Sequence, residues 1–242
     1  MTFKSGIVVS LKMSVTLLGL AVFASSANAT LITSSGGMSA IDGTLTFDGP
    51  PVNYFGTGPI QVGVGVGENI TWFSTNSSFQ GGSVCNFSGG YGFGGNGSWR
   101  GKSMIGVNSY NNGDVMTIAF NDGPVKEVGG FLNYATFGYG DAFIAAYDSS
   151  NNLLESYNLS AVAPISTPNG FNVGAFRGIV RARDDIKYFT MSGAYIGADD
   201  VVFHRGGQIS VVPEPGAIAT GVIMLGSLAF GMTRRRFRRH GA

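Results

Sequence analysis

Apolar and polar residues alternate with a period of two through much of the chain between residues 30 and 212. In the run 115–120, for example, the heavier apolar side chains are Met116, Ile118 and Phe120. Such alternation places one side of an extended strand against a core and the other side toward solvent. No stretch of helical length in this segment has the i, i+3, i+4, i+7 apolar spacing of an amphipathic helix. The segment is therefore expected to be all-β.

Turn-forming residues separate the strand-like runs. Residues 148–152, Asp-Ser-Ser-Asn-Asn, suit a hairpin loop because Asn and Asp tolerate left-handed backbone and form local hydrogen bonds. Residues 121–124, Asn-Asp-Gly-Pro, mark another turn. Short strands separated by turns are typical of an antiparallel β-sandwich or jelly roll. The pattern predicts strands at 44–47, 60–66, 69–73, 104–108, 115–120, 125–133, 142–147, 153–159, 175–180, 186–191 and 200–203.

Residues 1–29 have the pattern of a secretory signal peptide. An apolar stretch covers 15–24, and the small residues Ala27 and Ala29 occupy the two positions that signal peptidase reads, which predicts cleavage after Ala29. The preceding positive residues are Lys4 and Lys12. The alternative is an uncleaved anchor, but this apolar stretch is too short to cross a hydrocarbon core of ~30 Å.

Residues 213–242 contain three parts in a fixed order. Pro213-Glu214-Pro215 comes first, and residues 216–232 follow without a charge. As a helix this run would span about 25 Å, enough for a thin bilayer. A basic cluster closes the chain: Arg234, Arg235, Arg236, Arg238 and Arg239. By the positive-inside rule the arginines stay in the cytoplasm, so the middle segment is expected outside.

This arrangement resembles the PEP-CTERM sorting signal of Gram-negative bacteria. The resemblance implies recognition by an exosortase in the inner membrane, cleavage near Pro213-Glu214-Pro215, and release or transfer to the cell surface or extracellular matrix. It also implies an association with exopolysaccharide and biofilm. The alternative is a permanent membrane anchor in which the Pro-Glu-Pro tripeptide is fortuitous.

The 30–212 segment is long enough for one domain with its own core. Its second half, about 115–205, is similar to galactose-binding-like sandwiches. The runs that carry this similarity are 128–132, 145–148, 176–179 and 199–203. The resemblance implies a fold and not an activity.

Charge and composition narrow the functional classes. The whole chain has a formal net charge of +1, but its 30–212 segment carries 8 basic and 13 acidic residues and is therefore acidic. A nucleic-acid-binding protein needs a basic face to neutralise phosphates, so this class is excluded. Glycine occurs 39 times and charged residues make up only 12%, a composition that favours turns over helices.

The stretch 81–101 consists mostly of Gly, Ser, Asn and aromatic residues. One hypothesis is a mobile loop in which Tyr91, Phe93 and Trp99 stack on sugar rings. The alternative, which the composition favours, is a flexible surface loop without a ligand.

Carboxylates offer a second candidate site. Asp184-Asp185 and Asp199-Asp200 are paired in sequence, but adjacent strand residues point to opposite faces, so neither pair forms a glycosidase dyad by itself. A structural calcium site is another hypothesis, because calcium prefers oxygen ligands. Its ligands would be Asp199, Asp200, Asp42 and Asp48. The simpler interpretation is that these are solvated turn carboxylates.

Other chemistry finds little support in the sequence. The tripeptide Gly101-Lys102-Ser103 lacks the earlier glycine of a phosphate-binding loop, since that position is Asn96. Cys85 is the only cysteine, so we expect a buried thiol and no internal disulfide. With His204 as the one histidine of the 30–212 segment, a zinc shell built on His and Cys cannot be completed.

The sequence thus predicts an exported, non-enzymatic β-sandwich that has a structural or carbohydrate-binding role. Its expected partners are signal peptidase, exosortase, the inner membrane during transit, and exopolysaccharide. The alternative function is a secreted hydrolase of polysaccharides that uses carboxylates from separate strands.

Overall fold

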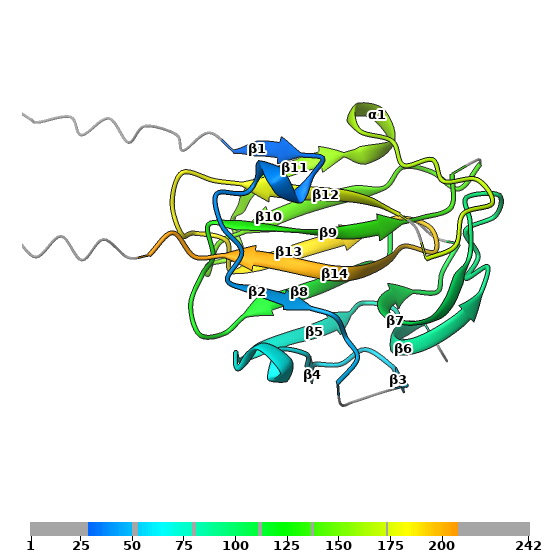
Figure 1. The fold of residues 1–242 in the computed structure, drawn as a ribbon, viewed down its shortest axis with the longest axis horizontal. Helices are drawn as coiled ribbons and strands as arrows, with labels where there is room; N and C mark the ends of the chain where they lie inside the picture. The colour runs from blue at the N-terminus through cyan, green and yellow to red at the C-terminus, as the bar shows by residue number, and fades with distance from the viewer. Residues whose placement is uncertain are drawn as a thin grey trace, which may run out of the picture.

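The computed structural model of the protein describes residues 29–49, 53–78, 81–110, 113–136, 138–172 and 174–207. These residues form two antiparallel β-sheets that pack face to face, with almost no helix (Figure 1). The prediction of an all-β fold is therefore confirmed. None of the helices in the described part of the chain has the length and apolar character needed to cross a bilayer.

The larger sheet, sheet A, has the strand order β1-β12-β9-β14-β7-β6-β3, and β2 pairs with β14. Its members are β1 (Thr30–Ile32), β2 (Gly43–Leu45), β3 (Tyr54–Phe55), β6 (Gly82–Gly89), β7 (Trp99–Val107), β9 (Glu127–Asn133), β12 (Ala175–Val180) and β14 (Gly197–His204).

The smaller sheet, sheet B, has the order β11-β10-β13-β8-β5-β4. Its members are β4 (Ile60–Gln61), β5 (Ile70–Ser74), β8 (Val115–Phe120), β10 (Phe143–Tyr147), β11 (Leu153–Asn158) and β13 (Tyr188–Ser192). Three short helical turns complete the described structure: η1 (Ser35–Gly37), η2 (Val64–Val66) and α1 (Leu159–Val162).

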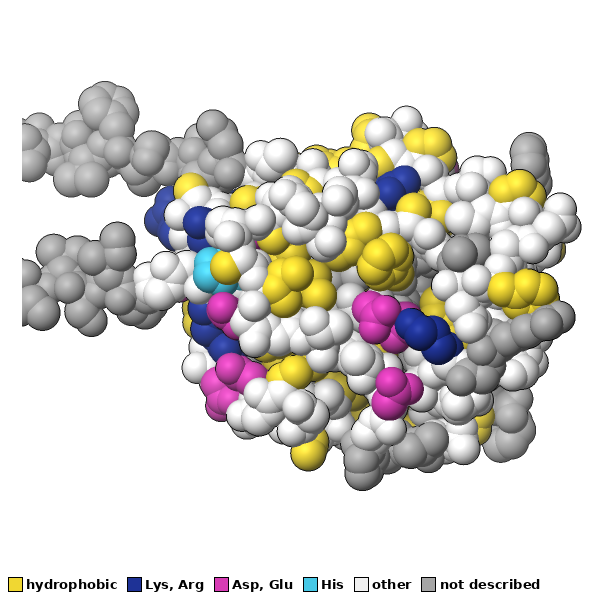
Figure 2. Space-filling view, in the orientation of Figure 1, with side chains coloured by type: hydrophobic (Ala, Val, Ile, Leu, Met, Phe, Trp, Pro, Cys, Tyr) yellow, Lys and Arg dark blue, Asp and Glu magenta, His cyan; other side chains and the backbone are white. Residues whose placement is uncertain are grey.

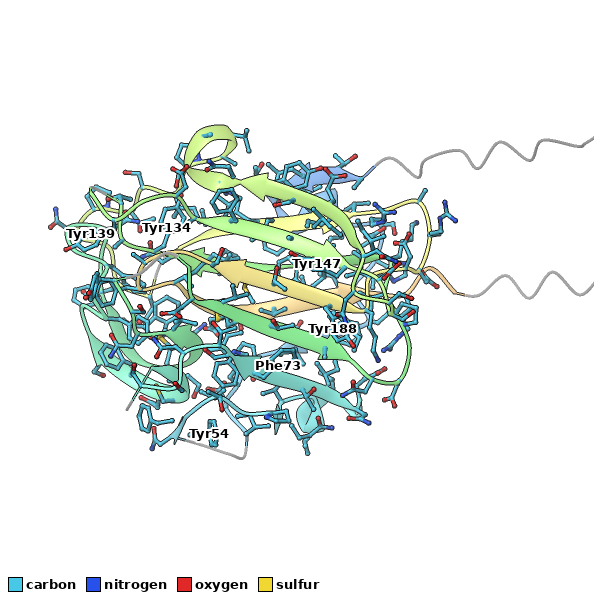
Figure 3. The ribbon with its side chains drawn as sticks, turned by 180° about the vertical axis from the view of Figure 1, so that it is seen from behind. Tyr54, Phe73, Tyr134, Tyr139, Tyr147 and Tyr188 are labelled. Atoms are coloured by element: carbon cyan, nitrogen blue, oxygen red, sulfur yellow. The ribbon has the colours of Figure 1, made fainter. Side chains whose placement is uncertain are left out.

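The core lies between the two sheets and follows the period of two. Met116, Ile118 and Phe120 on β8 are fully buried, as the sequence predicts. The opposite side of sheet B carries the outward residues, and there the register pairs Tyr147 directly with Tyr188 (Figure 3). On β5 and β13, buried residues that face the core alternate with half-buried residues on the outer face.

The predicted hairpin loop at 148–152 is confirmed and its turn chemistry is visible. The Asp148 carboxylate accepts hydrogen bonds from the backbone N–H groups of Ser150 and Asn152, both at 2.8 Å. Asn151 adopts a left-handed φ of 60°. These local bonds connect β10 to β11, which pair in antiparallel fashion.

Several elements differ from the prediction, among them β1 and β3, which lie outside every predicted strand. The expected strand at 60–66 is only β4, because the chain turns at Gly63, whose carbonyl accepts hydrogen bonds from the backbone N–H groups of Val66 and Glu68 around η2. The stretch 81–101, expected as a loop, contains β6 and the start of β7. Its small residues pair across the hairpin from Gly82↔Val107 to Gly89↔Trp99, with one register shift between Phe87 and Ser88.

The two ends of the described chain lie at the same end of the sandwich (Figure 1). The turn between β6 and β7 lies at the opposite end. The two ends of the described chain and the loops that connect β6 to β7 and α1 to β12 therefore lie at opposite ends of the sandwich.

Candidate functional site

A solvent-exposed aromatic ring lies on the outer face of sheet A. Phe131 on β9 is 43% exposed, and its register partner on β12 is Phe176, which is only 4% exposed. The two rings meet edge to face, with centroids 5.7 Å apart and planes at 80°. Neighbouring Leu132 points the other way, into the core. Phe131 is therefore held as an outward aromatic surface by the buried ring beside it.

An irregularity in β14 brings two carboxylates to the same place. The pairing of β14 with β9 shifts register between Asp199 and Val202, and Asp200 has a left-handed φ of 46°. The backbone N–H of Asp200 donates to Asp199 Oδ1 at 2.7 Å. The register pairs Asp199 with Phe131, so the bulge lies beside the aromatic ring. Bulges of this kind re-aim side chains and are enriched at functional sites.

Lys102 on β7 joins the two carboxylates. Its ammonium nitrogen lies 2.7 Å from Asp199 Oδ2 and 3.1 Å from Asp200 Oδ2. The Asp199 side chain is 4% exposed, while those of Asp200 and Lys102 are 35% and 46% exposed. The sequence predicts that adjacent aspartates point to opposite faces of a strand. That expectation is wrong at this position, because the bulge breaks the alternation.

The electrostatics of this cluster differ between its members. Burial raises the pKa of Asp199, against the hydrogen bonds that it accepts from Lys102 and from the Asp200 backbone. The hydrogen bond to Asp199 raises the pKa of Lys102, so the ammonium stays charged at neutral pH. With both carboxylates ionised the cluster carries a net charge of −1.

We name the set Phe131, Phe176, Lys102, Asp199 and Asp200 the outer-face site. Figure 2 shows hydrophobic side chains gathered over β9 and β14 beside a small group of acidic and basic side chains. An exposed ring next to rigid donors and acceptors matches the two sides of a sugar, whose C–H face is apolar and whose rim carries hydroxyls. The net negative charge of the outer-face site disfavours anionic ligands.

The four carboxylates considered for calcium do not come together as a set. Asp42 lies against His204, with its Oδ1 at 3.1 Å from His204 Nδ1, and it accepts a hydrogen bond from the Arg205 backbone at 2.7 Å. Asp48 lies in the exposed segment after β2. Within the described ranges, no three acidic, histidine or cysteine side chains gather closely enough to hold a metal ion.

The proposed sugar-stacking residues of the glycine-rich stretch are buried. Tyr91, Phe93 and Trp99 are 7%, 0% and 1% exposed and form a second, smaller core with Met104. The hypothesis that these three rings meet a ligand is therefore wrong. The glycines let the hairpin fold its aromatic residues inward, because large rings gain more from burial than from exposure. Cys85, as expected, is a buried free thiol, and burial raises its pKa.

The predicted processing residues lie almost entirely outside the described part of the chain. These are Ala27, Pro213, Glu214, Pro215, Arg234, Arg235, Arg236, Arg238 and Arg239. Ala29 is described and packs against the main core, and β1 begins at Thr30.

Sequence reasoning missed Phe131 and Lys102. A signal for Phe131 was present, because in the run 125–133 this large ring occupies the strand side opposite Val128 and Leu132. Lys102 was considered only as part of a phosphate-binding loop. Its contacts depend on residues 97 and 98 positions away in sequence, and no local pattern carries that information.

No protein-family model matches the chain, and no curated protein matches its sequence. The function therefore has to be argued from the sequence signals and from the geometry of the described residues.

Proposed function

We propose that this protein is exported and acts at the cell surface or in the extracellular matrix by binding polysaccharide, without converting it chemically. The ends of the sequence support export and sorting by an exosortase, and the outer-face site supports carbohydrate binding. The sandwich is proposed to be a jelly roll of the galactose-binding-like type.

The observation that carries this proposal is the exposed ring of Phe131 beside the Lys102–Asp199–Asp200 cluster. A pyranose ring stacked on Phe131 would bring its hydroxyls toward a charged donor and a charged acceptor. Hydrogen bonds to charged groups are stronger than neutral ones, and both partners are already oriented by each other. The site is therefore ordered before a ligand arrives.

The position of the described ends supports a surface role. Since Ala29 and Gly207 lie at the same end of the sandwich, both proposed targeting segments would leave the domain on one side (Figure 1). Loops at the opposite end would then face away from the membrane during transit.

A specific observation favours a second candidate, the polysaccharide hydrolase. Asp199 has a raised pKa and lies next to the more exposed Asp200, and two carboxylates in different environments are the pattern of an acid and its partner. The Lys102 ammonium, however, bridges them, so that both carboxylates are already engaged in an ion pair. We therefore favour binding over hydrolysis.

A matched pair of variants tests the binding proposal. Phe131 and Phe55 are 43% and 44% exposed, on β9 and β3 respectively. We expect Phe131→Ala to weaken binding to neutral polysaccharides about tenfold, because stacking removes the exposed ring from water. Phe55→Ala should leave binding unchanged. Equal affinities for both variants and the unmodified chain would contradict the assignment of this site.

The same samples separate binding from hydrolysis. Incubation with neutral and anionic polysaccharides, followed by measurement of new reducing ends, should show no cleavage. Cleavage that disappears in Asp200→Asn would instead establish the hydrolase.

A further inference from the structure

The turn between β6 and β7 is an ordered structure that rests on the segment before β12. The backbone of Ser98 forms a parallel bridge with Phe171, with hydrogen bonds to the Gly170 carbonyl and from Asn172 at 2.9 Å each. Asn96 is buried and donates to the carbonyls of Tyr134 and Ile165. This loop pair therefore keeps its shape without a ligand.

Two open depressions flank the Gly94-Gly95 turn, and both are lined by these two glycines. The larger, about 820 Å³, has the 45% exposed ring of Phe171 and the amide of Asn169 in its wall. The smaller, about 170 Å³, has Tyr139 in its wall, which is 40% exposed. Tyr139 is held edge to face on Tyr195, with centroids 5.9 Å apart, and lies at this end of the molecule (Figure 3). Each depression thus contains one exposed aromatic ring, Phe171 in the larger and Tyr139 in the smaller. The Gly94-Gly95 turn between them carries no side chains.

The fold does not require glycine at two positions in the larger depression. Gly90 and Gly95 have no left-handed φ, and a Cβ atom built at either position would meet nothing within 4 Å. By contrast, neighbouring Gly94 has a φ of 62° and needs its glycine for the turn. At a position where neither the backbone conformation nor the packing requires glycine, the lack of a side chain leaves the backbone N–H and C=O groups accessible to a ligand that approaches closely.

The chemistry of the walls selects the ligand. The described side chains that line the two depressions are all uncharged, with Asn169 and Phe171 in the larger and Thr136 and Tyr139 in the smaller. A peptide usually binds by adding a strand to a sheet edge, but the hairpin at Ser98 is already bridged to Phe171. A sugar chain needs only aromatic surfaces and hydrogen-bonding groups.

We propose that these depressions form a second polysaccharide-binding site, the hairpin groove, which takes a neutral chain across Gly94-Gly95. One pyranose stacks on Phe171 and another on Tyr139. This inference shares the ligand class of the proposed function but concerns different residues, so either can fail while the other holds.

Selective labelling provides a direct test. The full-length chain, labelled with ¹⁵N-glycine and kept in a detergent without a sugar headgroup, is titrated with neutral tetraoses and hexaoses of glucose, galactose and mannose. We expect chemical-shift changes at Gly90, Gly94 and Gly95 with at least one series, and tighter binding of the hexaose than of the tetraose. Changes at Gly129 and Gly130 on β9 alone would support the outer-face site and overturn the hairpin groove.

Substitutions sharpen the test. Gly95→Leu should abolish the shifts at Gly90 and Gly94 without a change in thermal stability, because its side chain projects into open space. Gly65→Leu is the matched control, since a Cβ atom at Gly65 also meets nothing within 4 Å and this residue lies on η2 outside the groove. Phe171→Ala should weaken hexaose binding about tenfold.

Three outcomes overturn the proposal. They are unchanged binding in Gly95→Leu, equal losses in Gly95→Leu and Gly65→Leu, and binding of an unrelated extended peptide at the same glycines without any neutral oligosaccharide binding.

Discussion

A single buried amide connects the loops at the hairpin end of the molecule. Asn96 is 3% exposed, and its side-chain nitrogen donates to Asn133 Oδ1 at 2.7 Å and to two carbonyls. Its side-chain oxygen accepts from the backbone of Thr167 at 2.7 Å. A buried polar residue is tolerated when every partner is satisfied, and its removal leaves those partners unpaired.

We therefore expect Asn96→Ala to lower the free energy of unfolding by about 2–4 kcal/mol. Chemical denaturation measures this loss, and hydrogen exchange should speed up in residues 89–98 and 165–172. Asn108→Ala is the control, because Asn108 is exposed and its change should stay within about 0.5 kcal/mol. Equal stabilities for the two variants would show that the Asn96 network contributes nothing.

The Asp42 carboxylate predicts a specific dependence of stability on acid. Burial acts to raise its pKa, but hydrogen bonds from the Arg205 backbone and from His204 outweigh it, so the pKa lies below the ordinary 3.8. A lowered pKa in the folded state gives stability that is present above 3.8 and is lost as pH falls through the folded value. Below pH 4, Asp42→Asn should therefore lose less stability than the unmodified chain.

Thermal melts between pH 2 and pH 6 measure this difference. Asp48→Asn is the control, since Asp48 is exposed in the segment after β2. If Asp42→Asn and the unmodified chain lost the same thermal stability as the pH falls, the role of the Asp42 contacts would be contradicted.

At the scale of elements, the sequence predicts those strands whose large apolar residues alternate. The run 115–120 coincides with β8 and 175–180 with β12. The strand β6 was missed because Gly, Ser and Asn dominate it, so that propensity indicated a loop while pairing with β7 imposed a strand. The outer-face site was missed for a different reason, because it depends on a β14 bulge that only tertiary pairing creates.

Close contact between β9 and β12 predicts the effect of adding one methyl group. A Cβ atom at Gly129 would lie 2.7 Å from Phe176 Cζ, 2.8 Å from Gly178 Cα and 2.9 Å from the Arg177 carbonyl. Backbone atoms cannot move away without disturbing the pairing. We expect Gly129→Ala to destabilise the fold by about 1–3 kcal/mol.

Denaturant midpoints measure this loss, with Gly65→Ala as a matched control in open space. Because Phe176 supports Phe131, Gly129→Ala should also weaken neutral polysaccharide binding even under conditions in which the variant remains folded. Unchanged stability in Gly129→Ala would mean that β9 and β12 can move apart at little cost in free energy.

At the scale of the whole molecule, the described residues present two candidate sugar sites on a domain whose sequence is acidic. The outer-face site has a net negative charge and the hairpin groove has no charged wall. The outer-face site therefore disfavours anionic polymers and the hairpin groove offers them no charged partner, and two sites on one domain would bind a long chain more tightly than either alone. The excess of acidic over basic residues can be counted from the sequence. The location of the two candidate sugar sites on separate surfaces depends on the strand register of sheet A.

The prediction about proteolytic processing also concerns the whole molecule. Thr30, the residue expected at the mature amino end, pairs with Val180, and Leu31 pairs with Ile179. Cleavage after Ala29 keeps β1 whole, whereas cleavage beyond Ile32 would remove it and expose the edge of β12. We therefore expect a surface form that begins at Thr30 and ends near Pro213.

Intact-mass measurement of the protein from its native cell tests this expectation, with a strain that lacks the exosortase as the control. In that strain the chain should begin at Thr30 but keep Arg234–Arg239 and remain in the inner membrane, because the basic end stays in the cytoplasm. Replacement of Glu214 by Ala in the normal strain should give the same retained species if Pro213-Glu214-Pro215 is the recognised motif. A surface form that still carries the arginines would refute sorting by cleavage, while leaving the two sugar sites to be judged by their own variants.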